Sequence, residues 1–452
     1  MSVNDDIKKQ VKGRGDPATA LGIETSDTGV GSNFVSNYPP YSFWRQDQVS
    51  LAERALDEAP DPETSFGLYV HIPFCRKRCK FCYYMVLTEK NAADIQRYVD
   101  AVLREAELSS RRAAVAGRPL KFVYFGGGTP SFISARHMRQ LVGGLRDSLC
   151  WDGVEEVTFE CEPGTLTQSK LEAIREAGVT RLSLGIQNFN DEILEANGRA
   201  HTTKEIFRVA PWVRDLGFEQ LNIDLIAGLV GENWDTWKDS VDKALEMDPE
   251  SVTVYQMELP YNTIYSQQLL DGTDPGVADW NTKRAWHEYA FRTLADAGYE
   301  TSSAYTMVKP GGRFVYRDSV WHGADLLGVG VSSFGHVRGV HYQNQSRWEP
   351  YLQKIEAGES AIDRAYETVP DERVTREMIL LLKRGYLEPA YFQEKYSVDI
   401  LERFGKVWDG LHDQGLLGYD SDRIELTPDG LLRVDQLLSE FYDEKYRNSR
   451  YT

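Results

Sequence analysis

Short runs rich in β-branched and aromatic residues alternate with longer amphipathic stretches through the middle of the chain. The runs are GLYVHI (67–72), KFVYFG (121–126), EEVTFE (155–160), TRLSLGI (180–186), QLNIDLIAG (220–228) and SVTVYQM (251–257). Between them, stretches such as residues 92–114 repeat apolar positions at helical spacing. This alternation predicts an α/β fold of six βα units, either a partial TIM-like barrel or an open sheet. In both folds the chemistry lies at the carboxyl ends of the strands.

The pattern changes on both sides of this region. Residues 1–60 have no sustained period, so we expect an N-terminal arm that is partly irregular; its aromatic cluster, 38–44, either anchors the arm or covers a site. Residues 61–300 hold the barrel, and the Gly-rich, aromatic residues 301–365 predict an irregular extension. Residues 366–452 give helical patterns, then a short strand, a turn and a helix, which are typical of a small winged-helix-like accessory domain.

Composition and charge exclude several classes of protein. Lys and Arg number 51 against 69 Asp and Glu in 452 residues, which gives a net charge of −18 and disfavours a nucleic-acid partner that needs a broad basic face. No apolar stretch approaches the roughly 18 residues that span a bilayer. The N-terminus mixes both charge signs without an apolar segment, unlike a secretory signal. We therefore expect a cytoplasmic protein, acting as a monomer without a membrane or nucleic-acid partner.

Three of the five cysteines lie within eight residues, in HIPFCRKRCKFCYY directly after the first strand. They are Cys75, Cys79 and Cys82. Thiolates this close together favour zinc or an iron–sulfur cluster. A structural zinc site needs a fourth ligand, and neither Cys150 nor Cys161 completes a standard zinc spacing. A four-iron cluster with three cysteine ligands would leave one iron open to a small molecule.

Several motifs in this order resemble the radical S-adenosylmethionine (SAM) superfamily, specifically its oxygen-independent coproporphyrinogen III dehydrogenase branch. The motifs are YVHIPFCRKRCKFC (69–82), FGGGTPS (125–131), FECEP (159–163), RLSLGIQ (181–187), NIDLIAG (222–228) and LTPDGLL (426–432). The resemblance covers roughly residues 66–445 and implies the partial barrel rather than the open sheet. It also implies a [4Fe–4S] cluster on the three clustered cysteines.

The same resemblance implies a set of residues that bind S-adenosylmethionine. They are Tyr69, Phe81, Gly126, Gly127, Gly128, Thr129, Glu160, Gln187, Arg199 and Asp224. Each suits the task chemically, because glycine lets a ligand approach the backbone, carboxylates hold ammonium and hydroxyl groups, and arginine binds a carboxylate through two N–H groups. Glu162 lies two residues beyond Glu160, so a bulge in that strand would exchange their roles.

The resemblance further implies the opening reaction. An electron from a donor such as flavodoxin or ferredoxin cleaves S-adenosylmethionine, and the resulting 5′-deoxyadenosyl radical abstracts hydrogen; this branch often binds two S-adenosylmethionine molecules. The hydrogen comes either from a propionate of coproporphyrinogen III or from the methyl group of the second S-adenosylmethionine. The first route gives decarboxylation, and the second gives C-methylation or cyclopropanation.

Peripheral residues lead us to expect the second route, on a small conjugated natural product. The coproporphyrinogen enzymes typically carry a further cysteine two residues after the third ligand, where this chain has Tyr84. The net charge of −18 also opposes a tetracarboxylate substrate unless a local basic pocket overrides it. The alternatives are oxygen-independent coproporphyrinogen III dehydrogenase, a haem chaperone of the same branch, and a zinc-binding structural protein.

Overall fold

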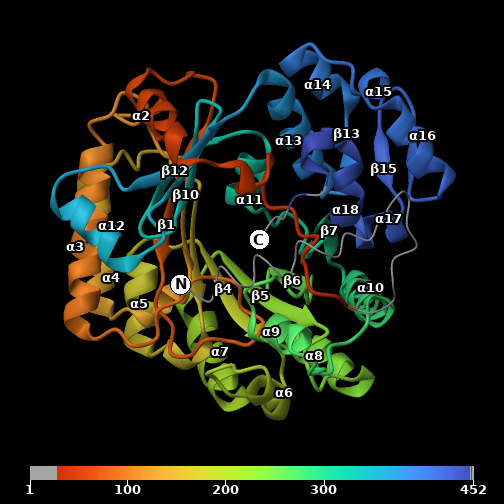
Figure 1. Cartoon of the computed structure of the whole chain (residues 1–452). Helices are drawn as coiled ribbons and strands as arrows, with labels where there is room; N and C mark the ends of the chain where they lie inside the picture. The colour runs from red at the N-terminus through yellow and green to blue at the C-terminus, as the bar shows by residue number, and fades with distance from the viewer. Residues whose placement is uncertain (1–27, 448, 450–452) are drawn as a thin grey trace.

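The computed structural model describes residues 28–447 and 449 (Figure 1). Its centre is a curved sheet of twelve strands in the order β12-β11-β10-β9-β1-β2-β3-β4-β5-β6-β8-β7. The six predicted strands are β1 (Phe66–Ile72), β2 (Phe122–Gly127), β3 (Glu156–Cys161), β4 (Arg181–Gln187), β5 (Gln220–Ala227) and β6 (Ser251–Gln256). Each pairs in parallel with the next, as the alternating pattern predicts.

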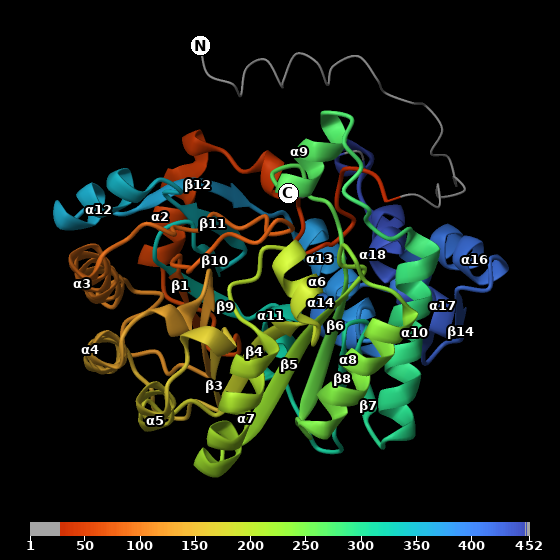
Figure 2. The same ribbon diagram turned by 90° about the horizontal axis from the view of Figure 1, so that it is seen from below.

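Helices cover the outer face of this parallel region, and Figure 2 shows them outside the strands. They are α3 (Ala92–Ser109), α4 (Ala135–Ser148), α5 (Gln168–Glu176), α7 (Thr203–Leu216), α8 (Trp234–Glu246) and α10 (Trp280–Asp296). The short helices α6 (Asp191–Ala196) and α9 (Ile264–Leu270) instead pack against Phe81 in the loop after β1. In α3, the Asn91 side chain accepts from the amides of Ala93 and Asp94, which fixes the first turn. The apolar face of α3, including Tyr98 and Val102, then packs into the main core.

The segment 301–365, expected to be irregular, instead extends the sheet at both ends. It contains most of β7 (Glu300–Ser303), then β8 (Thr306–Val308), α11 (Val315–Trp321), β9 (Asp325–Val329), β10 (Phe334–Val337), β11 (Val340–Asn344), α12 (Trp348–Glu356) and most of β12 (Ile362–Glu367). Strand β9 pairs in parallel with β1, while β8 pairs antiparallel with β6. The strands are short, and every residue of β9 and β11 is buried, so no apolar–polar alternation reveals them in the sequence.

The C-terminal unit has its own core and a three-stranded sheet in the order β13-β15-β14. Its elements are α13 (Pro370–Leu382), β13 (Tyr386–Leu387), α14 (Pro389–Tyr396), α15 (Ile400–Arg403), α16 (Gly405–Asp413), β14 (Leu417–Tyr419), β15 (Ile424–Leu426), α17 (Pro428–Leu432) and α18 (Val434–Leu437). The large buried side chains Trp408 and Phe441 pack at the centre of this unit. Helices followed by a β-hairpin form the winged-helix-like arrangement that the sequence predicts.

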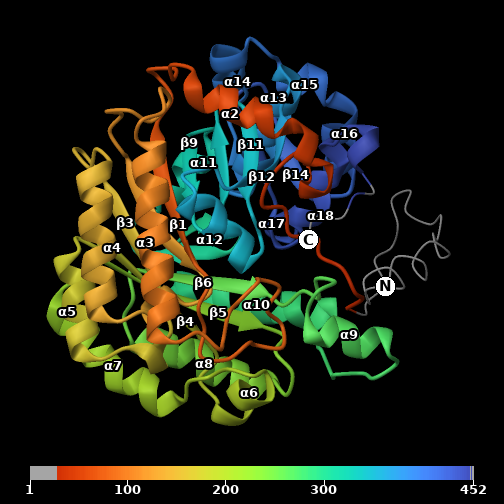
Figure 3. The same cartoon turned by 60° about the vertical axis from the view of Figure 1, so that its left-hand side comes forward.

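The arm joins the barrel to the C-terminal unit (Figure 3). Tyr38 is fully buried against the rings of Tyr442 and Tyr446, and Arg45 bridges to Ala365 of β12. Helix α2 (Val49–Asp57) then packs on β12 and leads into the barrel. The expectation of an irregular arm over residues 1–27 lies outside the described residues. Among the helices that are described, none has the length and apolar character needed to cross a membrane.

Candidate functional site

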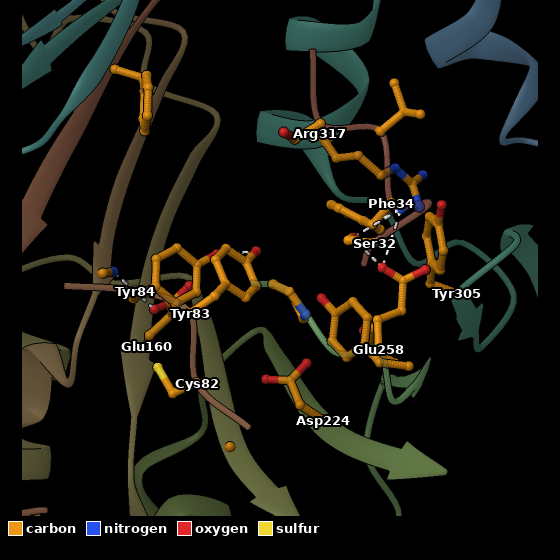
Figure 4. Close-up of a pocket in the computed structure, with 18 of the residues that line it drawn as sticks. Ser32, Phe34, Cys82, Tyr83, Tyr84, Glu160, Asp224, Glu258, Tyr305 and Arg317 are labelled. Carbon is orange, nitrogen blue, oxygen red and sulfur yellow. Dashed lines mark hydrogen bonds between the residues drawn. The ribbon is translucent and has the colours of Figure 1, made fainter. Parts of the chain in front are cut away.

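A cavity of about 1100 Å³ lies where the carboxyl ends of the parallel strands face the arm and the C-terminal unit. Of the thirteen site residues predicted from the sequence, every one except Gly126 lines it. The aromatic cluster of the arm also contributes, because Tyr41 and Trp44 lie in the wall. Figure 4 shows Cys82, Glu160 and Asp224 grouped on one side of this space and Arg317 on the other.

The three clustered cysteines occupy the loop after β1, and none of them forms a disulfide. The Sγ of Cys75 lies 3.2 Å from the Thr129 hydroxyl, and Arg199 donates to the Sγ of Cys79 at 3.4 Å. Burial raises the pKa of Cys75 to about 12 and that of Cys82 to about 11. Without a bound metal these two thiols therefore keep their protons.

The arrangement of the thiols fits a cluster better than a single ion. Within residues 28–447, no three His, Cys, Asp or Glu side chains converge closely enough to hold one metal ion. A single zinc ion would draw its sulfur ligands to about 2.3 Å. Three thiols that face one cavity without converging suit the larger [4Fe–4S] group, and the donor Arg199 suits its thiolates.

The glycine turn after β2 is tied to the cysteine loop by its backbone. The amide of Gly128 donates to the carbonyl of Ile72, and that of Thr129 donates to Phe74, both at 2.8 Å. A Cβ on Gly128 would lie 2.8 Å from the backbone of Pro73. Gly127 has a φ of 116°, and a Cβ there would lie 2.7 Å from the His71 ring. These two glycines therefore set the distance between β2 and the cysteine loop, a packing role that the sequence did not suggest.

Glu160 and Glu162 differ sharply in their surroundings. Glu160 accepts from the Tyr124 hydroxyl at 2.6 Å and from the Gly127 amide at 3.2 Å, and burial raises its pKa to about 7. Burial also acts on Glu162, but hydrogen bonding to His201 and nearby arginines, including Arg76 at 3.0 Å, lower its pKa overall. Glu160 therefore offers the cavity a carboxyl group without a cation, whereas Glu162 is already neutralised.

The remaining predicted residues lie on the neighbouring strands. Asp224 accepts from the Ser183 hydroxyl at 2.9 Å and from the Asn222 amide at 2.8 Å, and burial raises its pKa. Gln187 has a φ of 69°, which is rare for a residue other than glycine, and its buried Oε1 has no hydrogen-bond partner. An unmet acceptor beside the cysteine loop is what a site for an ammonium or hydroxyl group requires.

Two aromatic side chains complete the predicted set. Tyr69 donates to or accepts from the His71 ring at 3.2 Å and stacks on Tyr124, while Phe81 packs against a small apolar group that includes Met257. Tyr69 and Phe81 therefore shape the cavity through apolar surface as much as through polar contacts.

The prediction from the sequence did not include a group of cationic side chains that lines the cavity. We call this group the basic wall. It comprises Arg181, Arg284, Arg317, Arg364, Arg376 and Lys383. The five arginines lie on β4, α10, α11, β12 and α13, and Lys383 directly follows α13. These residues share no local motif, so only the fold brings them together. The cavity is thus locally basic in a chain whose net charge is −18.

Part of the arm, residues 32–35, closes the cavity beside the basic wall. Glu258 accepts from the Ser32 hydroxyl and from the amide of Phe34, the latter at 3.2 Å (Figure 4). Lys383 donates to the carbonyl of Val35 and pairs with Asp435 at 2.7 Å. The barrel and the C-terminal unit therefore both hold the same segment of the arm.

Comparisons with known proteins agree with this geometry. A model of the radical SAM superfamily matches residues 69–244. The heme chaperone HemW of Lactococcus lactis is 27% identical over 374 residues, 82% of this chain and 96% of that protein. The oxygen-independent coproporphyrinogen III oxidase of Escherichia coli is 26% identical over 389 residues, 82% and 84% of the two chains. The solved structure of E. coli coproporphyrinogen III oxidase, HemN, has a TM-score of 0.80 at 23% identity, covering 90% and 96%.

These relatives contradict our expectation of C-methylation or cyclopropanation of a natural product. They carry the names of a heme chaperone and a coproporphyrinogen oxidase, which are the alternatives that the sequence left open. The expectation depended on Tyr84, whose ring stacks on Tyr83 with centroids 4.4 Å apart in the cavity wall. The expectation also depended on the negative net charge of the chain, but the basic wall makes the cavity itself positively charged.

The likeness to HemN confirms the predicted α/β partial barrel. Proteins of this superfamily use a [4Fe–4S] cluster, S-adenosylmethionine and an electron donor. The matched domain begins at Tyr69, before the cysteine loop, and includes the glycine turn and the strands that carry Glu160, Gln187 and Asp224. Residues 69–244 therefore match the radical SAM superfamily, and over most of its length the chain is similar to proteins of the coproporphyrinogen oxidase-like branch of that superfamily.

Proposed function

We propose that the protein catalyses oxidative decarboxylation of a propionate side chain on a porphyrinogen of the coproporphyrinogen class. The observation that carries this proposal is the basic wall, because its six cations face the same cavity as the three cysteines. A porphyrinogen with several propionates needs cations of this kind, and arginine binds a carboxylate through two parallel N–H groups. In the reaction, the 5′-deoxyadenosyl group would take one hydrogen atom from the side chain, carbon dioxide would leave, and one electron would pass to an external one-electron acceptor, so that the side chain becomes a vinyl group.

In this proposal Cys75, Cys79 and Cys82 hold the cluster, and the cofactors supply the radical chemistry. The protein's own residues position the reactants and keep water out. The glycine turn, Glu160 and Gln187 would orient S-adenosylmethionine beside the cysteine loop. Gly128, Thr129 and Asp224 are the candidates for holding a second molecule of S-adenosylmethionine, and a flavodoxin or ferredoxin would supply the electron.

The test is anaerobic turnover with the reconstituted protein, a strong reductant, S-adenosylmethionine and coproporphyrinogen III. We expect 5′-deoxyadenosine, carbon dioxide and a porphyrinogen with at least one vinyl group, measured by mass spectrometry. Cys79→Ala serves as the control for reactions that do not need the cluster. Formation of 5′-deoxyadenosine without any vinyl product would contradict the proposal.

Haem binding is the second candidate function, and the similarity to HemW favours it. The tyrosine-rich cavity with its basic wall would also take a haem and its propionates. A haem titration followed by absorbance separates the two candidates. Tight haem binding together with failure to convert coproporphyrinogen III would favour the chaperone function.

A further inference from the structure

Two buried arginines line the cavity near the amino-terminal end of β4. Arg181 is the first residue of β4 and is 2% exposed, and Arg317 in α11 is 8% exposed. Both guanidinium groups lie over the ring of Phe314, at 4.3 and 5.6 Å from its centre. One aromatic ring therefore supports two like charges that line the same space.

Neither guanidinium has all of its N–H groups bonded. Arg181 donates from one terminal nitrogen to the Ser251 hydroxyl at 2.9 Å, but its Nε is buried without a partner. Arg317 donates twice to Asp318 and once to Ser302, while its other terminal nitrogen has no partner. Buried N–H groups in folded proteins are nearly always bonded, so two such donors in one cavity need a cause.

Arg181 forms no ion pair within 4.0 Å among the residues that the structure describes, although its charge opposes the rise in pKa that burial causes at Glu156 and Asp224. The carboxylate of Glu156 is the candidate for an ion partner. Its oxygens accept from Thr158 and from the amides of Val315 and Tyr316 instead of from Arg181. A buried arginine that no carboxylate contacts directly is costly unless a ligand supplies a hydrogen-bonded anion.

The strand register places Arg181 some distance along β4 from Asp224, which lies at the end of the cavity where the proposed reaction occurs. Asp224 lies beside Gly185 of β4, four residues beyond Arg181. At about 3.3 Å per residue, the two levels are about 13 Å apart along the strand. One carboxylate side chain of a large substrate can therefore lie at the level of Asp224 while another reaches Arg181 and Arg317.

We propose that Arg181 and Arg317 together bind a substrate carboxylate that does not react, and so fix which side chain lies beside the cofactor. The identity of the substrate rests on the function proposed above, whereas the binding of a carboxylate at this position does not. The pair thus acts as a specificity-determining subsite for a multiply carboxylated ligand.

The test compares an acid with its ester at equilibrium. Coproporphyrin III and its tetramethyl ester are titrated against the reconstituted protein under anaerobic conditions, with porphyrin fluorescence as the signal. The variants are Arg181→Met and Arg317→Gln. The matched control is Arg292→Gln, because Arg292 also lies over an aromatic ring, that of Tyr289 at 6.0 Å, but is exposed on α10 outside the cavity.

We expect the ratio of acid affinity to ester affinity to fall at least tenfold in both cavity variants and to stay unchanged in the control. An unchanged ratio in either cavity variant would overturn the proposal. Because the ratio cancels general damage to the cavity, it remains informative if a variant is less stable. Turnover of coproporphyrinogen III by the wild type is measured separately, so failure of the proposed function and failure of this subsite give different results.

Thermal unfolding of the ligand-free protein gives a second readout. Methionine has a similar length without the charge, so Arg181→Met removes a buried cation that no carboxylate contacts directly and should not lower the midpoint. A large fall in the midpoint with an unchanged affinity ratio would instead assign Arg181 a purely structural role.

Discussion

The two sides of the cavity are built in different ways. On the cysteine side, the residues that matter lie in short motifs, and backbone hydrogen bonds such as Gly128 to Ile72 join one motif to the next. On the side of the basic wall, the residues come from five separated elements, and long-range side-chain contacts such as Lys383 to Asp435 hold them. The first side is defined locally by the chain and the second only by tertiary structure. Mutations on the two sides of the cavity should therefore have different effects on activity and stability.

The largest effect is expected on the cysteine side. Cys79→Ala should remove the cluster and reduce cleavage of S-adenosylmethionine to background, because the sequence offers no fourth cysteine near the loop. Iron and sulfide analysis, cluster absorbance and 5′-deoxyadenosine formation measure the loss. Cys150→Ala is the matched control, since Cys150 is absent from the cavity wall. Loss of the cluster in that control, with the protein still folded, would refute the assignment.

A smaller effect is expected at the glycine turn. Gly127→Ala should lower the free energy of unfolding by about 1–3 kcal/mol, because φ is 116° and the added Cβ would lie 2.7 Å from His71. Reductive cleavage should fall while the cluster remains. Gly143→Ala, on helix α4 with nothing within 4 Å of the added Cβ, should instead stabilise by about 0.5–1 kcal/mol. Equal unfolding midpoints for the two variants would contradict this interpretation of the turn.

The smallest effect concerns the arm contact at Glu258. Burial raises the pKa of Glu258 from 4.5 to about 7. The folded state therefore retains a proton that the unfolded state loses, so this carboxyl's stabilisation is complete below about pH 4.5 and is lost as pH rises through about 7. Glu258→Gln cannot ionise, so between pH 5 and 8 the wild type should lose about 1–3 kcal/mol more stability than the variant.

Chemical denaturation at several pH values measures that difference. Glu359→Gln, an exposed change, is the control, and its stability should follow the wild type across the range. Parallel pH profiles for wild type and Glu258→Gln would show that the Glu258 contact does not respond to pH in this way.

The difference between the two sides also explains what the sequence could predict. All three cysteines and nine of the ten predicted cofactor residues line the cavity, because motif spacing fixes where each strand ends. Gly126 does not line it, since it packs toward Tyr124. Arg181 lies inside a recognised motif, but the residues that surround it, Phe314 before α11 and Ser251 of β6, are distant in sequence. No local signal could reveal the basic wall.

The fold divides in the same way. The six parallel strands are strongly apolar and regularly spaced, so their positions follow from the pattern alone. Strands β9 and β11 are five residues each, fully buried and close to glycines, so their pattern resembles that of a loop. The prediction of methylation rather than decarboxylation was wrong for a further reason. Tyr84 is a single position and net charge is an average over the chain, so neither indicates which side chains line the cavity.

The pairing of β9 with β1 has a consequence for how the protein is synthesised. Strand β1 emerges early, but its second neighbour begins at Asp325, roughly 260 residues after Phe66. At about 5–20 residues per second, one edge of β1 stays open on the ribosome for on the order of 10 to 50 s. The cysteine loop follows directly from this strand, and the C-terminal unit that closes the cavity is made later still. The order of translation thus leaves the proposed cluster ligands accessible to cluster delivery before tertiary closure encloses them.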